Sequence, residues 1–171
     1  MPDVASPFPL DAELVFRARP VRVAGRLTLE GASGQISYRY HLSDGAGAPV
    51  LVEQASGRFA LLRPFPPAAD PKTSGNAILV GNERYTLVGV RKLTMLDALG
   101  MISGATPNAS LLLSGMFEGP AGTLMREFVP GSNRQVYYLV KPLGKGDLLS
   151  AEAHAAAREA ARRAAGERDD D

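Results

Sequence analysis

The sequence predicts a mainly β protein in which antiparallel hairpins form one small barrel or two half-barrels, with a single α-helix at the C-terminus. Three observations lead to this prediction. The 171 residues include 18 glycines and 13 prolines, and these stand between short apolar runs, as turn residues do. Several of the runs alternate apolar and polar residues with a period of two, which is typical of β-strands. Only the C-terminal segment is rich in alanine, which favours a helix.

The length is that of one domain or of two very small ones. We expect its segments to be an irregular arm (1–13), a β domain (14–146, with 14–63 and 76–146 as two halves of it), and a helix with an acidic tail (147–171). Phe8 and Leu10 are the residues that can pin the arm to the domain. A proline-rich connector at 63–75 separates the two halves, because proline blocks both helix and ladder hydrogen bonding.

The clearest alternation in the first half runs from residue 35 to residue 42. Ile36, Tyr38, Tyr40 and Leu42 fall on one side, and Ser37, Arg39 and His41 fall on the other. Such a pattern predicts a strand with one buried face and one face in water. The next two runs, 50–54 and 58–62, flank a short turn and predict a hairpin.

The second half opens with another hairpin, formed by residues 78–80 and 84–93 around Gly81 and Asn82. Residues 94–102 have a mixed period and are expected to form a single helical turn. The remaining strands of this half are predicted at 110–117, 123–129 and 134–141, and the last two form a third hairpin.

The final segment should be a helix that begins after Asp147 or Ser150, either of which can cap it, and that covers residues 151–165. Glu159 stands four residues before Arg163, which adds modest support. No large apolar residue follows Leu149. The helix therefore has little to bury and is expected to project from the domain.

Composition excludes several classes of site. The chain has no cysteine and only two histidines, His41 and His154, so we expect no disulfide, no thiol chemistry, no metal site and no cofactor. The net charge is +1 with scattered basic residues, which argues against nucleic-acid binding. The first ten residues lack the basic and apolar regions of a secretory leader, so we expect none, and no apolar run is long enough for an integral membrane segment. We therefore expect a cytoplasmic protein that reaches a membrane only through a partner.

Two arrangements of polar residues are conceivable as catalytic sites. His41 and Asp44 could form a dyad, and Glu118 and Glu127 are two carboxylates on either side of a turn, as a hydrolase would use. An exposed strand histidine near a turn aspartate, and solvated hairpin ends, are the commoner structures. The glycine-containing loop at 144–146 lacks the strand and downstream acid of a phosphate site. No catalytic residue is assigned.

Binding is the alternative to catalysis, and its candidates are aromatic or basic. Tyrosine is enriched at protein interfaces, and an alanine-rich helix with arginines can dock on a partner. The candidate binding residues are Tyr38, Tyr40, His41, Tyr137, Arg158 and Arg162. The partner would be another protein or a second copy of the chain. A ligand-binding or hydrolytic barrel with His41, Glu118 and Glu127 around its mouth, and a structural subunit of a larger assembly, remain as alternatives.

Residues 38–45, 49–53 and 57–62 resemble the core of an uncharacterised bacterial β-rich domain family, a domain of unknown function. The later order, a hairpin at 80–90, Gly115-Met-Phe-Glu-Gly, and 148–152 entering a helix, is similar to that family's second half. The resemblance covers residues 20–160. Members are often encoded beside phage-shock-like, polyamine-synthase-like and ion-channel genes. The resemblance implies a small adaptor module linked to envelope stress that acts through protein contacts, and it implies no catalytic residue.

Overall fold

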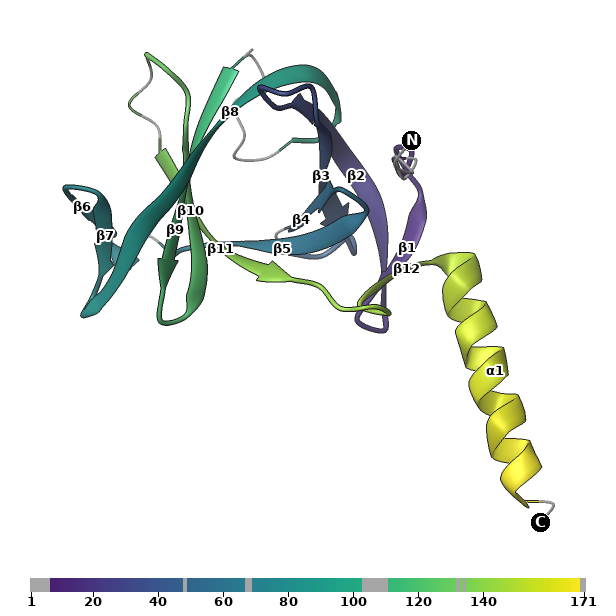
Figure 1. Cartoon of the computed structure of the whole chain (residues 1–171). Coiled ribbons are helices and arrows are strands. Elements are labelled where there is room, and N and C mark those ends of the chain that lie inside the picture. Colours follow the sequence, from purple (N-terminus) through teal and green to yellow (C-terminus); the bar gives the residue numbers. More distant parts are fainter. Residues whose placement is uncertain are drawn as a thin grey trace.

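The computed structural model describes residues 7–47, 49–66, 69–102, 111–131, 133 and 135–169. Its centre is a closed antiparallel barrel of eight strands in the order β2-β3-β4-β5-β11-β10-β9-β8, which a pairing between β2 and β8 completes (Figure 1). Strands β1 and β12 extend the sheet at one end, and β7 and β6 extend it at the other. The predicted fold class is confirmed, and of its two forms the single barrel is the one present.

The described strands are β1 (Glu13–Phe16), β2 (Arg19–Glu30), β3 (Ile36–Ser43), β4 (Val50–Ala55), β5 (Arg58–Pro64), β6 (Lys72–Ser74), β7 (Ala77–Val80), β8 (Glu83–Gly100), β9 (Leu111–Gly119), β10 (Gly122–Phe128), β11 (Gln135–Pro142) and β12 (Leu148–Ser150). The helix is α1 (Ala151–Asp169). The three predicted hairpins are confirmed as β4–β5, β7–β8 and β10–β11. Because β5 pairs with β11 and β2 pairs with β8, both halves of the β domain belong to one barrel.

The expected helical turn at 94–102 is wrong, because β8 continues without interruption to Gly100. The mixed period has a physical cause. The register of β8 shifts at two bulges, the first of which leaves Val88 unpaired against β9, while the second leaves Leu96 unpaired against β2. Each bulge adds one residue and reverses the alternation beyond it. A strand with two bulges therefore loses the simple period of two in its sequence.

Both faces of β3 are buried, so the prediction that its Ser37, Arg39 and His41 side lies in water is also wrong. That side points into the barrel. The opposite side contributes Tyr40 and Leu42 to an apolar cluster on the outside of the barrel. β1, β12 and Phe8 of the N-terminal arm pack on this cluster. Phe8 thus pins the arm as expected, with its ring stacked on Phe59 at 5.9 Å.

Part of the outer surface formed by β8, β9 and β10 is also covered by neighbouring strands. Ile78 on β7 packs with Tyr85, Phe117 and Leu124, which face outward from β8, β9 and β10. The β6–β7 hairpin therefore covers a second part of the outer surface, and Figure 1 shows it away from β1 and β12. Between these two coverings, large side chains of β8 remain exposed on the outer side of the barrel.

Helix α1 projects from the barrel, as predicted, and its main contacts are with β12 and β1 (Figure 1). The hydroxyl of Ser150 accepts a hydrogen bond from the amide of Ala153 at 3.1 Å, so Ser150 caps the helix. Glu159 and Arg163 lie 3.3 Å apart, in the expected ion pair. Over its described residues, the helix has no stretch long and apolar enough to cross a membrane.

Two glycines face each other where β2 and β8 close the barrel. A Cβ at Gly25 would lie 2.1 Å from the carbonyl oxygen of Met101, and a Cβ at Gly100 would lie 2.3 Å from that of Ala24. Gly100 also has a φ of +72°, which favours glycine. The close approach lets the amide of Met101 donate to the carbonyl of Ala24 at 2.8 Å. At this end of the seam there is no space for a side chain at position 25 or position 100.

We therefore expect Gly25→Ala to lower the free energy of unfolding by about 1–3 kcal/mol, because the added methyl group meets backbone that cannot rotate away. Chemical denaturation monitored by circular dichroism measures this. Gly89→Ala is the matched control, since a Cβ at that β8 position meets nothing within 4 Å. Equal stability of the two variants would contradict the role given to the seam.

Candidate functional site

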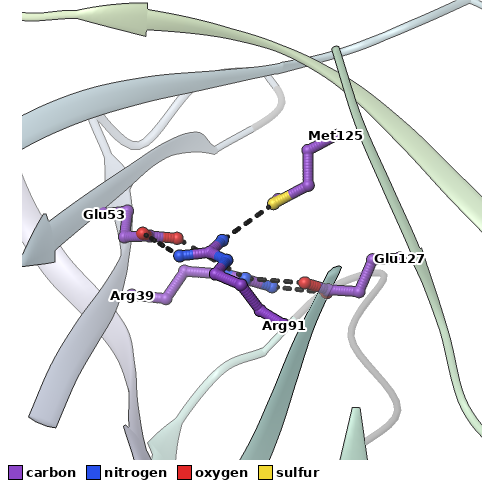
Figure 2. Close-up of polar contacts among 5 residues, drawn as sticks. All are labelled: Arg39, Glu53, Arg91, Met125 and Glu127. Carbon is purple, nitrogen blue, oxygen red and sulfur yellow. Dashed lines mark hydrogen bonds and ion pairs between the residues drawn. The ribbon is translucent and has the colours of Figure 1, made fainter. Parts of the chain in front are cut away.

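The interior of the barrel holds a cluster of charged side chains, here called the lumen cluster: Arg39, Glu53, Arg91 and Glu127 (Figure 2). Strand register places them together. Arg39 on β3 pairs directly with Glu53 on β4. Ser114 on β9 pairs with both Arg91 on β8 and Glu127 on β10. Side chains at paired positions share one face of a sheet, so all four point inward.

The strongest contact of the lumen cluster is bidentate. Arg39 donates hydrogen bonds of 2.6 and 2.8 Å to the two carboxylate oxygens of Glu127. Glu53 lies 3.8 Å from Arg39 and accepts a hydrogen bond of 3.3 Å from Arg91. A second nitrogen of Arg91 lies 3.3 Å from the sulfur of Met125. Two positive and two negative charges thus form one neutral network.

Arg39 is only 1% exposed, so its charge depends on these partners. Burial alone would lower the pKa of Arg39, but the charge of Glu127 and its hydrogen bonds outweigh burial and hold that pKa above its ordinary value. Arg39 therefore stays charged, and the two glutamates compensate it. Sequence reasoning did not find this cluster. The one available signal was the opposite charge of Arg39 and Glu53 on adjacent strands.

His41 lies in the same interior and is 1% exposed, which corrects its predicted place on a wet strand face. Its neighbours across the sheet are Gly25 and Leu51, and neither ring nitrogen has a hydrogen-bond partner within the described part of the chain. Burial, together with the smaller effect of the Arg39 charge, lowers the pKa of His41 to about 4. His41 is therefore neutral at pH 7 and is not available to a surface partner.

The two catalytic arrangements do not form. Asp44 is a partner of Arg19 and of the Ala46 amide, and these contacts, the amide first, hold its pKa below the ordinary value. Its partners do not include His41. Glu118 bonds to Thr123 at 3.2 Å near the β9–β10 turn. Glu127 pairs with Ser114, four residues from Glu118, so the backbone positions of the two glutamates lie about 13 Å apart along the sheet.

The three tyrosines proposed for binding have structural partners. Tyr40 is fully buried, which corrects its assignment as a surface residue. Its hydroxyl donates to Gln54 and accepts from the Phe8 amide. Burial raises the pKa of Tyr40 to about 12. Tyr38 is half-buried and stacks on Tyr40, with ring centroids 6.4 Å apart. Tyr137 is half-buried and donates to Gln135 at 2.8 Å.

Arg158 and Arg162, the two basic candidates, are exposed on α1 as expected. Arg162 lies 3.8 Å from Glu159 on the same helix. Helix α1 mainly contacts β12 and β1, whereas the candidate tyrosines lie on β3 and β11, so the candidate residues come from separate parts of the fold. A pocket of about 410 Å³ lies between the β2–β3 turn, the β4–β5 turn and β8. Its lining includes Arg91 but none of His41, Glu118 and Glu127. Among the described residues no group of His, Asp and Glu could hold a metal ion.

The most distinctive surface feature is an exposed apolar strip, here called the β8 outer face. Large apolar side chains that are exposed in the described residues gather there: Val88 (61%), Val90 (69%), Leu96 (52%), Leu99 (37%) and Met101 (79%). The remaining one, Leu10 of the N-terminal arm, has its side chain beside Gly100 at the end of β8. Sequence reasoning missed this face, since the two bulges conceal which residues of β8 point outward.

Comparison of the chain with protein-family models, with curated proteins and with solved structures found no match in any of the three.

Proposed function

We propose that this protein is a non-enzymatic protein-binding module, and that the β8 outer face is its contact surface. The observation that carries the proposal is the gathering of exposed large apolar side chains along β8 and at Met101, which directly follows it. An apolar surface of this kind is costly in water unless a partner covers it. The fully buried core of a protein interface is more apolar than the rest of the surface, and methionine is enriched there.

The charged residues support binding over catalysis. Proton transfer requires a group within hydrogen-bond reach of its substrate and free to change its charge. In the lumen cluster each carboxylate is engaged by an arginine inside a closed barrel. Glu118, the exposed carboxylate of the hydrolase hypothesis, lies far along the sheet from Glu127.

The resemblance to the bacterial family supports a narrower form of the proposal. In that form the module is an adaptor in envelope stress that works in the bacterial cytoplasm and reaches the membrane through its partner. The scattered distribution of the 19 basic residues supports a protein rather than a nucleic acid as that partner.

Site-specific photo-crosslinking in living cells tests the proposal. Benzoylphenylalanine at Val90, which is 69% exposed, is expected to give a discrete adduct with a protein, and Leu99→Lys in the same chain is expected to abolish it. The control position is Lys72 on β6, whose side chain is 75% exposed but lies outside the face. The same probe at Arg162 tests whether the helix is the contact instead. Absence of an adduct at Val90, or an equal adduct at Lys72, would overturn the proposal.

A further inference from the structure

The residue types along the β8 outer face are arranged symmetrically about a central point. This point lies between Thr94 and Met95. Counted outward from that point, Lys92 and Asp97 stand at equal distances, and so do Val90 and Leu99, followed by Val88 and Met101. The first pair has opposite charges, and the other two pairs are apolar. Such a sequence is self-complementary in the antiparallel direction.

The structure places Val90, Lys92, Asp97 and Leu99 on the same side of the strand. Arg91 and Leu93 point into the barrel, so Val90 and Lys92 point outward by alternation. Beyond the bulge at Leu96, Asp97 pairs with Thr28 and Leu99 pairs with Arg26. Those β2 residues alternate with Leu27 and Leu29 of the core, so Asp97 and Leu99 also point outward. The bulge is what keeps both halves of the strip on one surface.

Lys92 and Asp97 are both exposed, and neither forms an ion pair within the ranges that the structure describes. They lie five residues apart on the strand, about 16 Å at the usual rise, which is too far for them to neutralise one another. Apart from Thr94, the other exposed outward side chains of this stretch of β8 are apolar. Oppositely charged groups from a partner would give each of Lys92 and Asp97 an ion pair.

We propose that the partner of the β8 outer face is a second copy of this chain. This inference rests on the proposed function, protein binding through the β8 outer face, and identifies the protein that is bound. A two-fold axis passes between Thr94 and Met95, perpendicular to the strand, and the two β8 strands cross face to face in antiparallel directions. Lys92 of each copy meets Asp97 of the other, and Val90 meets Leu99. Such an interface is isologous and closes at two subunits.

Neither helix α1 nor the β6–β7 hairpin lies over the middle of β8. Helix α1 contacts β12 and β1. The β6–β7 hairpin packs on Phe117 and Leu124 through Ile78. Figure 1 shows both elements away from the middle of β8. The helix is therefore not the element that joins the two copies.

Sedimentation velocity on the purified full chain tests the inference. We expect a reversible dimer of twice 18.1 kDa. Lys92→Glu alone and Asp97→Lys alone are each expected to weaken the dimer at least about tenfold, because like charges then face each other across the axis. The two single variants mixed together should associate again, since each contact between positions 92 and 97 of the two copies then joins opposite charges. The double variant should also recover the dimer.

The outcomes separate the two proposals. A wild-type chain that stays monomeric, or single variants that dimerise as tightly as wild type, would overturn the second copy as partner. If the purified chain is monomeric while Val90 still crosslinks to a different protein in cells, the proposed function stands and only its partner is wrong. If neither association occurs, both proposals fail. Arg162→Glu on α1 is the control and should leave the dimer unchanged.

Discussion

Glu127→Ala is expected to lower the free energy of unfolding by about 3–5 kcal/mol, the usual cost of leaving a buried charge without its partner. Glu127 is 5% exposed and accepts both hydrogen bonds of Arg39, which is 1% exposed. Without Glu127, the Arg39 guanidinium keeps only Glu53, at 3.8 Å. Urea denaturation at neutral pH, with an unchanged m-value, measures the loss.

The matched variant for this experiment replaces the whole pair. Arg39→Met with Glu127→Leu removes both charges and leaves Glu53 with Arg91. Its stability is expected to lie close to that of wild type, because apolar side chains of similar size often substitute for a buried ion pair without loss. If Glu127→Ala were as stable as the double variant, the pair would not be a desolvated contact in solution.

Acidification is expected to destabilise the protein through His41. The pKa of this residue is about 4 in the folded state and 6.5 as a free side chain. Between these values the unfolded chain binds a proton that the folded chain does not, so stability falls as the pH drops from 6.5 to 4. The loss amounts to about 3 kcal/mol by pH 4, since one pKa unit corresponds to about 1.4 kcal/mol.

Thermal unfolding at a series of pH values tests this expectation in variants of the two histidines. His41→Leu should flatten the pH dependence between pH 6.5 and 4, because the leucine has no proton to bind. His154→Gln on the exposed helix should leave the wild-type dependence in place. A His41→Leu profile identical to wild type would assign the acid sensitivity to the carboxylates instead.

The local structure of this protein can be predicted from the sequence where a single kind of signal decides it. Turn residues mark the hairpins, and alanine content with Ser150 marks the helix. On β3 the alternation of polar and apolar residues is present as predicted, but its polar side does not face water. A charged residue on one side of a strand normally indicates that this side is exposed to solvent. Arg39 departs from that rule because Glu127, distant in sequence, neutralises it, and a local pattern does not contain this contact.

The same limit explains the candidate residues. His41 was a candidate for binding because polar side chains on a strand are usually exposed, and Tyr40 because tyrosine is enriched at interfaces. Closure of the barrel buries His41, and the N-terminal arm covers Tyr40. The β8 outer face escaped prediction for the opposite reason. Its residues are apolar and look like core residues, and only the bulges at Val88 and Leu96 decide which of them face solvent.

The seam between β2 and β8 also constrains the time course of folding. Gly25 meets Gly100 across it, and β5 pairs with β11, which the ribosome makes still later. Until both pairings form, the free edges of β2 and β5 expose unpaired backbone groups that can recruit strands from other chains. Folding dominated by such distant pairings is slow. The nascent chain is therefore most vulnerable to aggregation after its first four barrel strands have been made and before its last has joined them.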